Sequence, residues 1–114
     1  MNNKYHARKT LLDGIWFDSK AEAARYAELK LMARAGEIEH LRLQPRYIIH
    51  DAFRAASDGK KYRKIEYVGD FEYWDPKRHR LICEDVKGAR TDLYRVKRKL
   101  FLARYPSIYH EEID

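Results

Sequence analysis

Two aspartates and a lysine, Asp70, Asp85 and Lys87, have the types and spacing that metal-assisted hydrolysis requires. Asp70 and Asp85 lie on either side of a short stretch rich in turn-forming residues. If this turn is centred between Lys77 and Arg78, Asp70 faces Asp85 across an antiparallel strand pair, with Cβ atoms about 4.5–5.5 Å apart. Two carboxylates that close repel each other unless they share a cation. The pattern therefore predicts a divalent-metal site.

Strand alternation adds the lysine to this pair. Asp85 and Lys87 are two residues apart and point to the same face of their strand, whereas Glu84 points to the other face. A cation held by carboxylates lowers the pKa of its bound water and acts as a Lewis acid on a phosphate, and a lysine stabilises the developing negative charge. The chemistry indicated is hydrolysis of a phosphodiester. Glu84 is an alternative to Asp85 as the second carboxylate, although its side chain faces away from Lys87.

The elements that must position these residues follow from periodicity and turn signals. Asp13-Gly14 favours a two-residue hairpin turn, and Leu93, Val96, Leu100 and Phe101 have the spacing of an apolar helix face. We expect an α/β fold with a central mixed sheet, two flanking helices and an N-terminal β-hairpin. The expected elements are a hairpin over 9–17, a helix over 18–35, strands over 41–51, 61–74 and 80–87, a loop over 51–60, a helix over 91–104 and a strand over 107–113.

Composition and charge restrict the class of protein. The chain has 114 residues, which corresponds to one domain, here divided into an N-terminal arm and hairpin (1–17) and a core (18–114). A net charge of +6, with basic residues gathered at 60–64 and 90–104, favours a polyanionic partner. A single cysteine, Cys83, excludes an internal disulfide and a multi-cysteine zinc site. No apolar run suggests a membrane span or a signal peptide, which predicts a cytoplasmic protein.

Four short segments resemble a known superfamily. Residues 69–71 (Gly-Asp-Phe) and 84–88 (Glu-Asp-Val-Lys-Gly) resemble the PD-(D/E)XK signature of restriction-type and resolvase-type nucleases. Residues 17–22 and 43–45 resemble a phage-encoded family of small proteins of that superfamily, and also the S-x-x-E helix and Q-P strand of the Tn7-type transposition endonuclease catalytic domain. Gly69 stands where the name of the superfamily has proline.

The resemblance implies a restriction-endonuclease-like α-β-β-β-α-β core that forms a single nuclease domain. It implies a catalytic set of Asp70, Asp85, Lys87 and Glu22, with Glu22 reaching the metal from the first helix beside the two aspartates. Gln44 would lie near the same cleft. The implied cofactor is Mg²⁺, for which Mn²⁺ substitutes, and no small-molecule cofactor is expected. The implied activity is that of a phage- or prophage-encoded endonuclease in a bacterial cytoplasm.

The resemblance favours branched DNA such as Holliday junctions as the substrate. A resolvase cuts two symmetric strands, which requires two active sites and predicts a homodimer. The alternatives are a nicking, restriction-like or transposase-like endonuclease on duplex DNA, a non-catalytic DNA-binding module with the same fold, and an RNA-directed protein.

Several of these residues have a second interpretation. Ser19 and Glu22 have the spacing of a capping box, in which each side chain binds a backbone N–H at the helix start. The five histidines are scattered without ligand spacing, which argues against a histidine metal site. The basic second helix could contact the phosphate backbone or form a solvated surface. The candidate DNA-binding residues are Gln44, Tyr94, Lys97, Arg90, Arg95 and Arg98.

Overall fold

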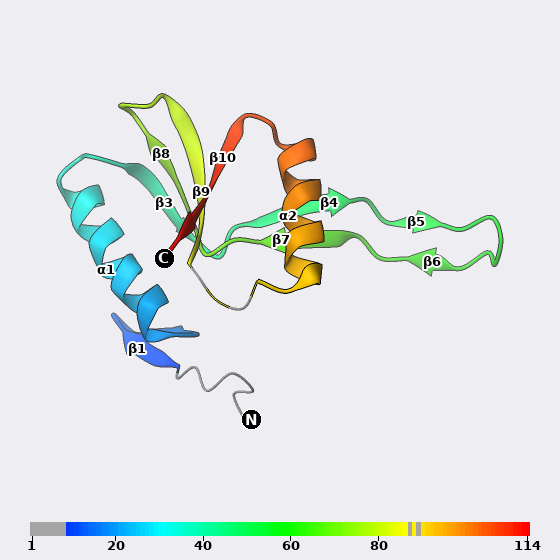
Figure 1. The fold of residues 1–114 in the computed structure, drawn as a ribbon, viewed down its shortest axis with the longest axis horizontal. Helices are drawn as coiled ribbons and strands as arrows, with labels where there is room; N and C mark the ends of the chain where they lie inside the picture. The colour runs from blue at the N-terminus through cyan, green and yellow to red at the C-terminus, as the bar shows by residue number, and fades with distance from the viewer. Residues whose placement is uncertain (1–8, 87, 89) are drawn as a thin grey trace.

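The centre of the fold is a mixed four-stranded sheet, seen in a computed structural model that describes residues 9–86, 88 and 90–114 (Figure 1). Its strand order is β10-β9-β8-β3, in which β10 is parallel to β9 and the other two pairs are antiparallel. The α/β class predicted from the sequence is confirmed. The strands are β3 (Glu39–Leu43), β8 (Phe71–Asp75), β9 (Arg80–Val86) and β10 (Ile108–Ile113).

Two helices flank this sheet in the predicted order. The helix α1 (Lys20–Arg34) follows the hairpin of β1 (Thr10–Leu12) and β2 (Ile15–Phe17), and α2 (Asp92–Arg104) connects β9 to β10. With the strands of the central sheet they give the order α-β-β-β-α-β. Each helix begins at a side chain that accepts a backbone N–H in the first turn, which is the usual N-cap. Neither helix in the described residues is long and apolar enough to cross a membrane.

Each face of the sheet packs against a different apolar cluster. Ile82 joins Leu29 of α1 and Phe71 in one cluster, whereas the next residue, Cys83, joins Phe101 of α2 in the other. Consecutive strand residues point to opposite faces, so this division follows from the alternation of β9. Burial raises the pKa of the Cys83 thiol to about 12, which is consistent with a packed core residue.

A long two-stranded ribbon contains the second half of the predicted strand over 41–51, the predicted loop over 51–60 and the first part of the predicted strand over 61–74, whose last residues belong to β8. Strands β4 (Arg46–His50) and β7 (Ile65–Val68) pair antiparallel, and β5 (Phe53–Arg54) pairs with β6 (Lys61–Tyr62) beyond them. Figure 1 shows this ribbon projecting from the body. The periodicity of 61–74 predicted one strand, but backbone breaks before and after β7 divide it into three.

The apolar face predicted for the second helix is wrong in three of its four residues. Only Phe101 is buried, whereas Leu93, Val96 and Leu100 are 65%, 56% and 41% exposed. The helix instead packs its aromatic side, including Tyr94, against the cluster that contains Phe101. The spacing of apolar residues predicts an apolar stripe on a helix, but it does not predict which of two such stripes is buried. The buried stripe is the one that packs against the neighbouring strands.

Candidate functional site

Asp70 lies in a bend just before β8. The predicted register of β8 and β9 is confirmed from Asp75 opposite Arg80 to Phe71 opposite Glu84, but the pair of Asp70 and Asp85 does not continue it. Instead the Asp70 N–H donates to the carbonyl of Glu84 at 3.0 Å. Asp70 and Phe71 therefore both lie opposite Glu84, as two consecutive residues do in a β-bulge. The Asp70 carboxylate accepts the N–H of Val86 at 2.7 Å, which fixes it beside the end of β9.

Asp85 is held by side chains from two other strands. The Tyr67 hydroxyl donates to its Oδ2, and His110 Nε2 lies 3.4 Å from the same oxygen and 2.6 Å from the Tyr67 hydroxyl. Arg98 of α2 donates to His110 Nδ1 at 3.1 Å, so Nδ1 is the acceptor and Nε2 carries the proton. In the described part of the chain, Oδ1 of Asp85 has no hydrogen-bond partner. Asp85 is therefore oriented through one oxygen.

Glu22 is buried among other carboxylates at the start of α1. Only 5% of the residue is exposed. Burial, and then the negative charges of Asp70, Asp18 and Asp85, raise its pKa to about 7. We call Asp18, Glu22, Asp70 and Asp85 the carboxylate cluster. Among the described residues, the charged neighbours that shift the pKa of Glu22 are all carboxylates.

The capping interpretation of Glu22 is confirmed in one of its two hydrogen bonds. The Ser19 Oγ accepts the Glu22 N–H at 3.1 Å. The reciprocal bond from the Glu22 carboxylate to the Ser19 N–H is absent among the bonds of the described residues. The serine therefore caps the helix, and the Glu22 carboxylate remains available to the cluster.

Asp70 has a raised pKa as well. Burial and the charges of Asp18 and Glu84, against the lowering effect of the Val86 N–H, raise it to about 6. Acidic side chains whose pKa values are raised toward neutrality, here the buried Glu22 and the half-buried Asp70, are often found at functional sites.

Hard oxygen ligands such as these suit Mg²⁺ or Mn²⁺. The donor chemistry of Glu22, Asp70 and Asp85 therefore fits such an ion. In residues 9–86, 88 and 90–114, no three His, Cys, Asp or Glu side chains are arranged as a ready metal-binding group. Lys87 lies outside the described residues.

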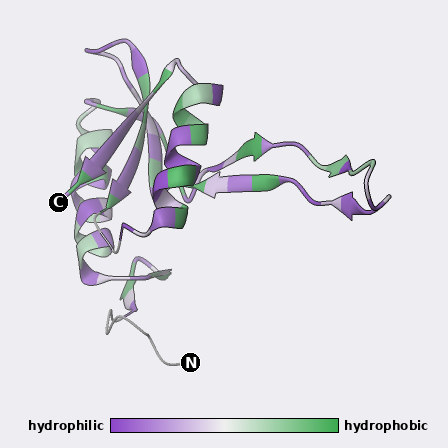
Figure 2. Ribbon diagram, turned by 45° about the vertical axis from the view of Figure 1, so that its right-hand side comes forward, coloured by the Kyte–Doolittle hydropathy of each residue, from purple (hydrophilic) through white to green (hydrophobic). Residues whose placement is uncertain are grey.

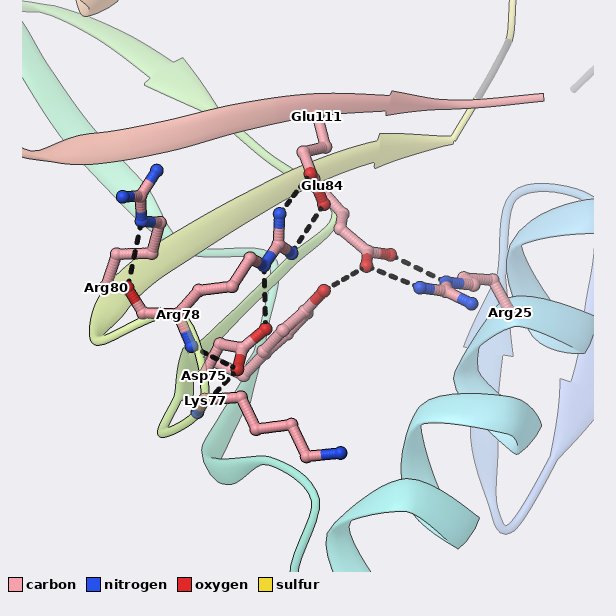
Figure 3. A network of polar contacts seen from close by, with 8 residues as sticks. Arg25, Asp75, Lys77, Arg78, Arg80, Glu84 and Glu111 are labelled. Carbon is pink, nitrogen blue, oxygen red and sulfur yellow. Dashed lines mark hydrogen bonds and ion pairs between the residues drawn. The ribbon is translucent and has the colours of Figure 1, made fainter.

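Glu84, the alternative to Asp85, has a structural role. It is fully buried, and Arg25 of α1 donates to both of its oxygens at 2.8 and 2.6 Å. The Tyr73 hydroxyl donates to one of them at 2.5 Å. Figure 3 shows Arg25 reaching Glu84 from the helix, beside a separate network of Arg78 with Asp75 and Glu111 at the turn. This bidentate pair ties α1 to the sheet and leaves Glu84 without a free oxygen.

Gly69, which replaces the proline of the signature, has a steric reason to be glycine. A Cβ built on it would lie 2.6 Å from the Cys83 sulfur and 3.4 Å from Pro45. The close approach of the two strands at the bend before Asp70 therefore excludes a side chain at this position.

The candidate DNA-binding residues lie in different surroundings. Gln44 is exposed, has φ of +48°, and donates its backbone N–H to the Asp70 carbonyl at 2.9 Å, so the two backbones are neighbours. The Tyr94 hydroxyl donates to Glu112 at 2.6 Å. Arg90 pairs with Glu112, Arg95 with Asp92 and Arg98 with His110, and Lys97 is half-buried on α2.

Sequence reasoning missed three residues of this site. Asp18 was assigned only to the helix start, Tyr67 was assigned to a strand, and His110 was dismissed with the other histidines. Parallel pairing of β10 with β9 places His110 opposite Cys83, two residues from Asp85. No local sequence signal predicts this, because the pairing joins segments separated by α2.

The fold and the carboxylate cluster define an α/β protein with a candidate acidic site at the end of its sheet. The family described as "Protein of unknown function (DUF1064)" matches residues 2–113, and the chain belongs to this family. No curated protein and no solved structure matches the chain.

Proposed function

We propose that this protein is a divalent-metal-dependent DNA endonuclease of the PD-(D/E)XK type. The observation that carries the proposal is that the charges of Asp70, in the bend before β8, and Asp85, in β9, both raise the pKa of the buried Glu22 of α1. Their repulsion costs stability at neutral pH, and a protein tolerates that cost where a bound cation offsets it. The order α-β-β-β-α-β and the resemblance of residues 84–88 support the same assignment.

Glu22, Asp70 and Asp85 would hold the ion. A bound Mg²⁺ would supply an acidified water and Lewis-acid activation of the phosphate. The chain's own contribution is positional: Val86 fixes Asp70 through its N–H, and Tyr67 with His110 fixes Asp85. The Lys87 ammonium is proposed to orient the attacking water and to stabilise charge on the phosphate.

The preferred substrate is branched DNA such as a four-way junction, cut by a homodimer in a bacterial cytoplasm. The exposed Leu93, Val96 and Leu100 of α2 have i, i+3, i+7 spacing, which suits packing against the same helix of a second copy. Nicking, restriction-like or transposase-like cleavage of duplex DNA is the alternative. A second alternative is a non-catalytic DNA-binding module. This alternative is favoured by the absence of a ready metal-binding group among the described residues.

Cleavage assays would test the proposal directly. Labelled four-way junction, linear duplex and supercoiled plasmid are incubated with Mg²⁺, with Mn²⁺, or with EDTA. We expect cleavage only with metal, and a loss of more than about 100-fold in rate for Asp70→Asn and Lys87→Ala. Matched controls are Glu39→Gln, an exposed carboxylate on β3, and Lys77→Ala, at the opposite end of the β8–β9 hairpin.

The outcomes separate the candidates. Equal cleavage by Asp70→Asn and wild type would remove the catalytic assignment. Cleavage of duplex in preference to junction would select the restriction-like alternative. Metal-independent DNA binding without any cleavage would select the non-catalytic module.

A further inference from the structure

The outer part of the projecting ribbon, residues 50–65, makes no contribution to the apolar core. We call this segment the arm. All of its residues except Ala55 are exposed, whereas the ribbon base contributes the buried Tyr47, Ile49 and Tyr67 to the cluster beneath α2. Figure 2 shows the outer end of the arm, with β5 and β6, standing clear of the sheet and both helices, and β6 is coloured hydrophilic. A segment that buries so little is not explained by stability of the fold.

The arm is stiffened by its own cross-strand contacts. Phe53 of β5 pairs with Tyr62 of β6, and their rings stack with centroids 5.2 Å apart at 14°. His50 packs edge-on against Phe53 at 5.3 Å. Asp58 accepts the Lys60 N–H at 2.8 Å and the Tyr62 hydroxyl, which closes the tip. An isolated two-stranded ribbon is only marginally stable in water, so these contacts maintain an extended shape that the body does not support.

The arm has a concentrated positive charge. It contains five basic side chains and two acidic ones, a net charge of +3 out of +6 for the whole chain. Both acids are engaged, Asp58 in the tip and Asp51 with Arg104 of α2 at 3.3 Å. Within the described ranges, Lys60, Lys61 and Arg63 have no ion-pair partner.

One pair of the arm places like charges opposite each other. Arg54 and Lys61 are directly paired across β5 and β6, next to the pair of Phe53 and Tyr62. Alternation puts this cationic pair on the face opposite the aromatic rings. Like charges directly opposite each other destabilise a strand pair, and a shared anion would remove the penalty. The arrangement favours a polyanionic ligand over an apolar one.

We propose that the arm is a DNA-binding element that lies along the sugar–phosphate backbone of a duplex next to the cleavage site. At about 3.3 Å per residue, each side of the arm extends about 17 Å from its base, and a duplex carries about five phosphates per strand over that length of its axis. Lysine and arginine contacts to phosphates give affinity without reading sequence. The arm contains no Asn or Gln, the residues that pair with adenine edges. The choice of DNA rests on the proposed function, but the binding can be measured without cleavage.

Binding of a fluorescent duplex of about 30 base pairs, followed by anisotropy in EDTA from about 50 to 200 mM salt, tests the proposal. The test variant is Lys60→Ala/Lys61→Ala/Arg63→Ala. The matched control, Lys9→Ala/Arg34→Ala/Lys77→Ala, removes the same charge from exposed positions off the arm. We expect the arm variant to bind on the order of 100-fold more weakly at about 0.1 M salt, with a slope of log K against log salt shallower by about 2–3.

Several outcomes would overturn the proposal: an unchanged slope for the arm variant, an equal loss in the control, or arm-dependent binding of duplex RNA but not DNA. A change in sedimentation mass of the arm variant would also overturn it, because the arm would then be a contact between copies. Circular dichroism and thermal melting verify that both variants fold. If DNA binding depends on the arm but no cleavage is seen, the arm proposal stands and the nuclease proposal fails. If DNA is cleaved but binding does not depend on the arm, the nuclease proposal stands and the arm proposal fails.

Discussion

Replacing Glu22 by glutamine tests whether the negative charge of Glu22, buried beside other carboxylates, destabilises the folded protein at neutral pH. The pKa of Glu22 is raised from an ordinary value of 4.5 to about 7 by burial and by Asp70, Asp18 and Asp85. The folded state therefore holds the proton more tightly than the unfolded state. The contribution of protonated Glu22 to the stability of the folded state is fully present below about pH 4.5 and is lost as the pH rises through about 7. A rise of this size corresponds to about 3 kcal/mol.

Glutamine resembles the protonated glutamate and does not ionise. In EDTA, Glu22→Gln should match wild type near pH 4 and exceed it by up to about 3 kcal/mol in the free energy of unfolding near pH 8. Urea denaturation at a series of pH values measures the difference. The substitution leaves the backbone N–H of residue 22 in place, so Ser19 continues to cap α1. Glu39→Gln, on the exposed side of β3, is the control and should show no pH-dependent gain.

Added Mg²⁺ should narrow this difference near pH 8. An ion bound by the folded state alone stabilises it by about 2.7 kcal/mol at 100 times its dissociation constant. Because protons compete for the same oxygens, wild type should gain more near pH 8 than near pH 5.5, and Glu22→Gln should gain less at both. A parallel pH dependence of wild type and variant in EDTA would refute the clustering of these carboxylates. A pH-dependent difference without any Mg²⁺ effect would refute only the metal site.

Three further predictions follow from the contacts of the fold. Arg25→Ala leaves the buried Glu84 carboxylate with only the Tyr73 hydroxyl and should cost about 3–5 kcal/mol by urea denaturation, whereas Lys77→Ala should cost almost nothing. Gly69→Ala forces a Cβ against the Cys83 sulfur at 2.6 Å and should cost about 1–3 kcal/mol in the same measurement; a neutral result would mean that the bend before Asp70 relaxes freely. Leu100→Glu should convert a homodimer to a monomer in sedimentation equilibrium without loss of folded structure, and an unchanged mass would exclude the exposed face of α2 as the interface.

Local signals predicted most of the element order. The Asp13-Gly14 hairpin, the helix that begins after Ser19 and the helix that begins after Thr91 are all present. Turn residues near Lys77 set the register of β8 and β9 over five pairs. These features depend on residues close in sequence, where capping, turn chemistry and strand alternation act directly.

The candidate site was predicted only in its residue types. The contact of the Asp70 carboxylate with the Val86 N–H and the close approach of Gly69 to Cys83 follow from no spacing rule. The orientation of Asp85 depends on Tyr67, which is 18 residues away in the sequence, and on His110, which the parallel pairing of β10 with β9 brings to it across α2. Lys87 lies outside the described residues, so its place beside the aspartates stays a prediction.

The sequence by itself determined both helices, the turns at Asp13-Gly14 and near Lys77, the excess of positive charge, and the acidic residues suited to hold a divalent ion. Each of these depends on interactions within a few residues or on composition alone. Only the tertiary structure decided that Glu84, the alternative to Asp85, is bound by Arg25, that α2 leaves Leu93 and Leu100 exposed, and that residues 50–65 project as an arm. These outcomes depend on which distant segments pair and pack, because burial and desolvation are properties of the assembled surfaces.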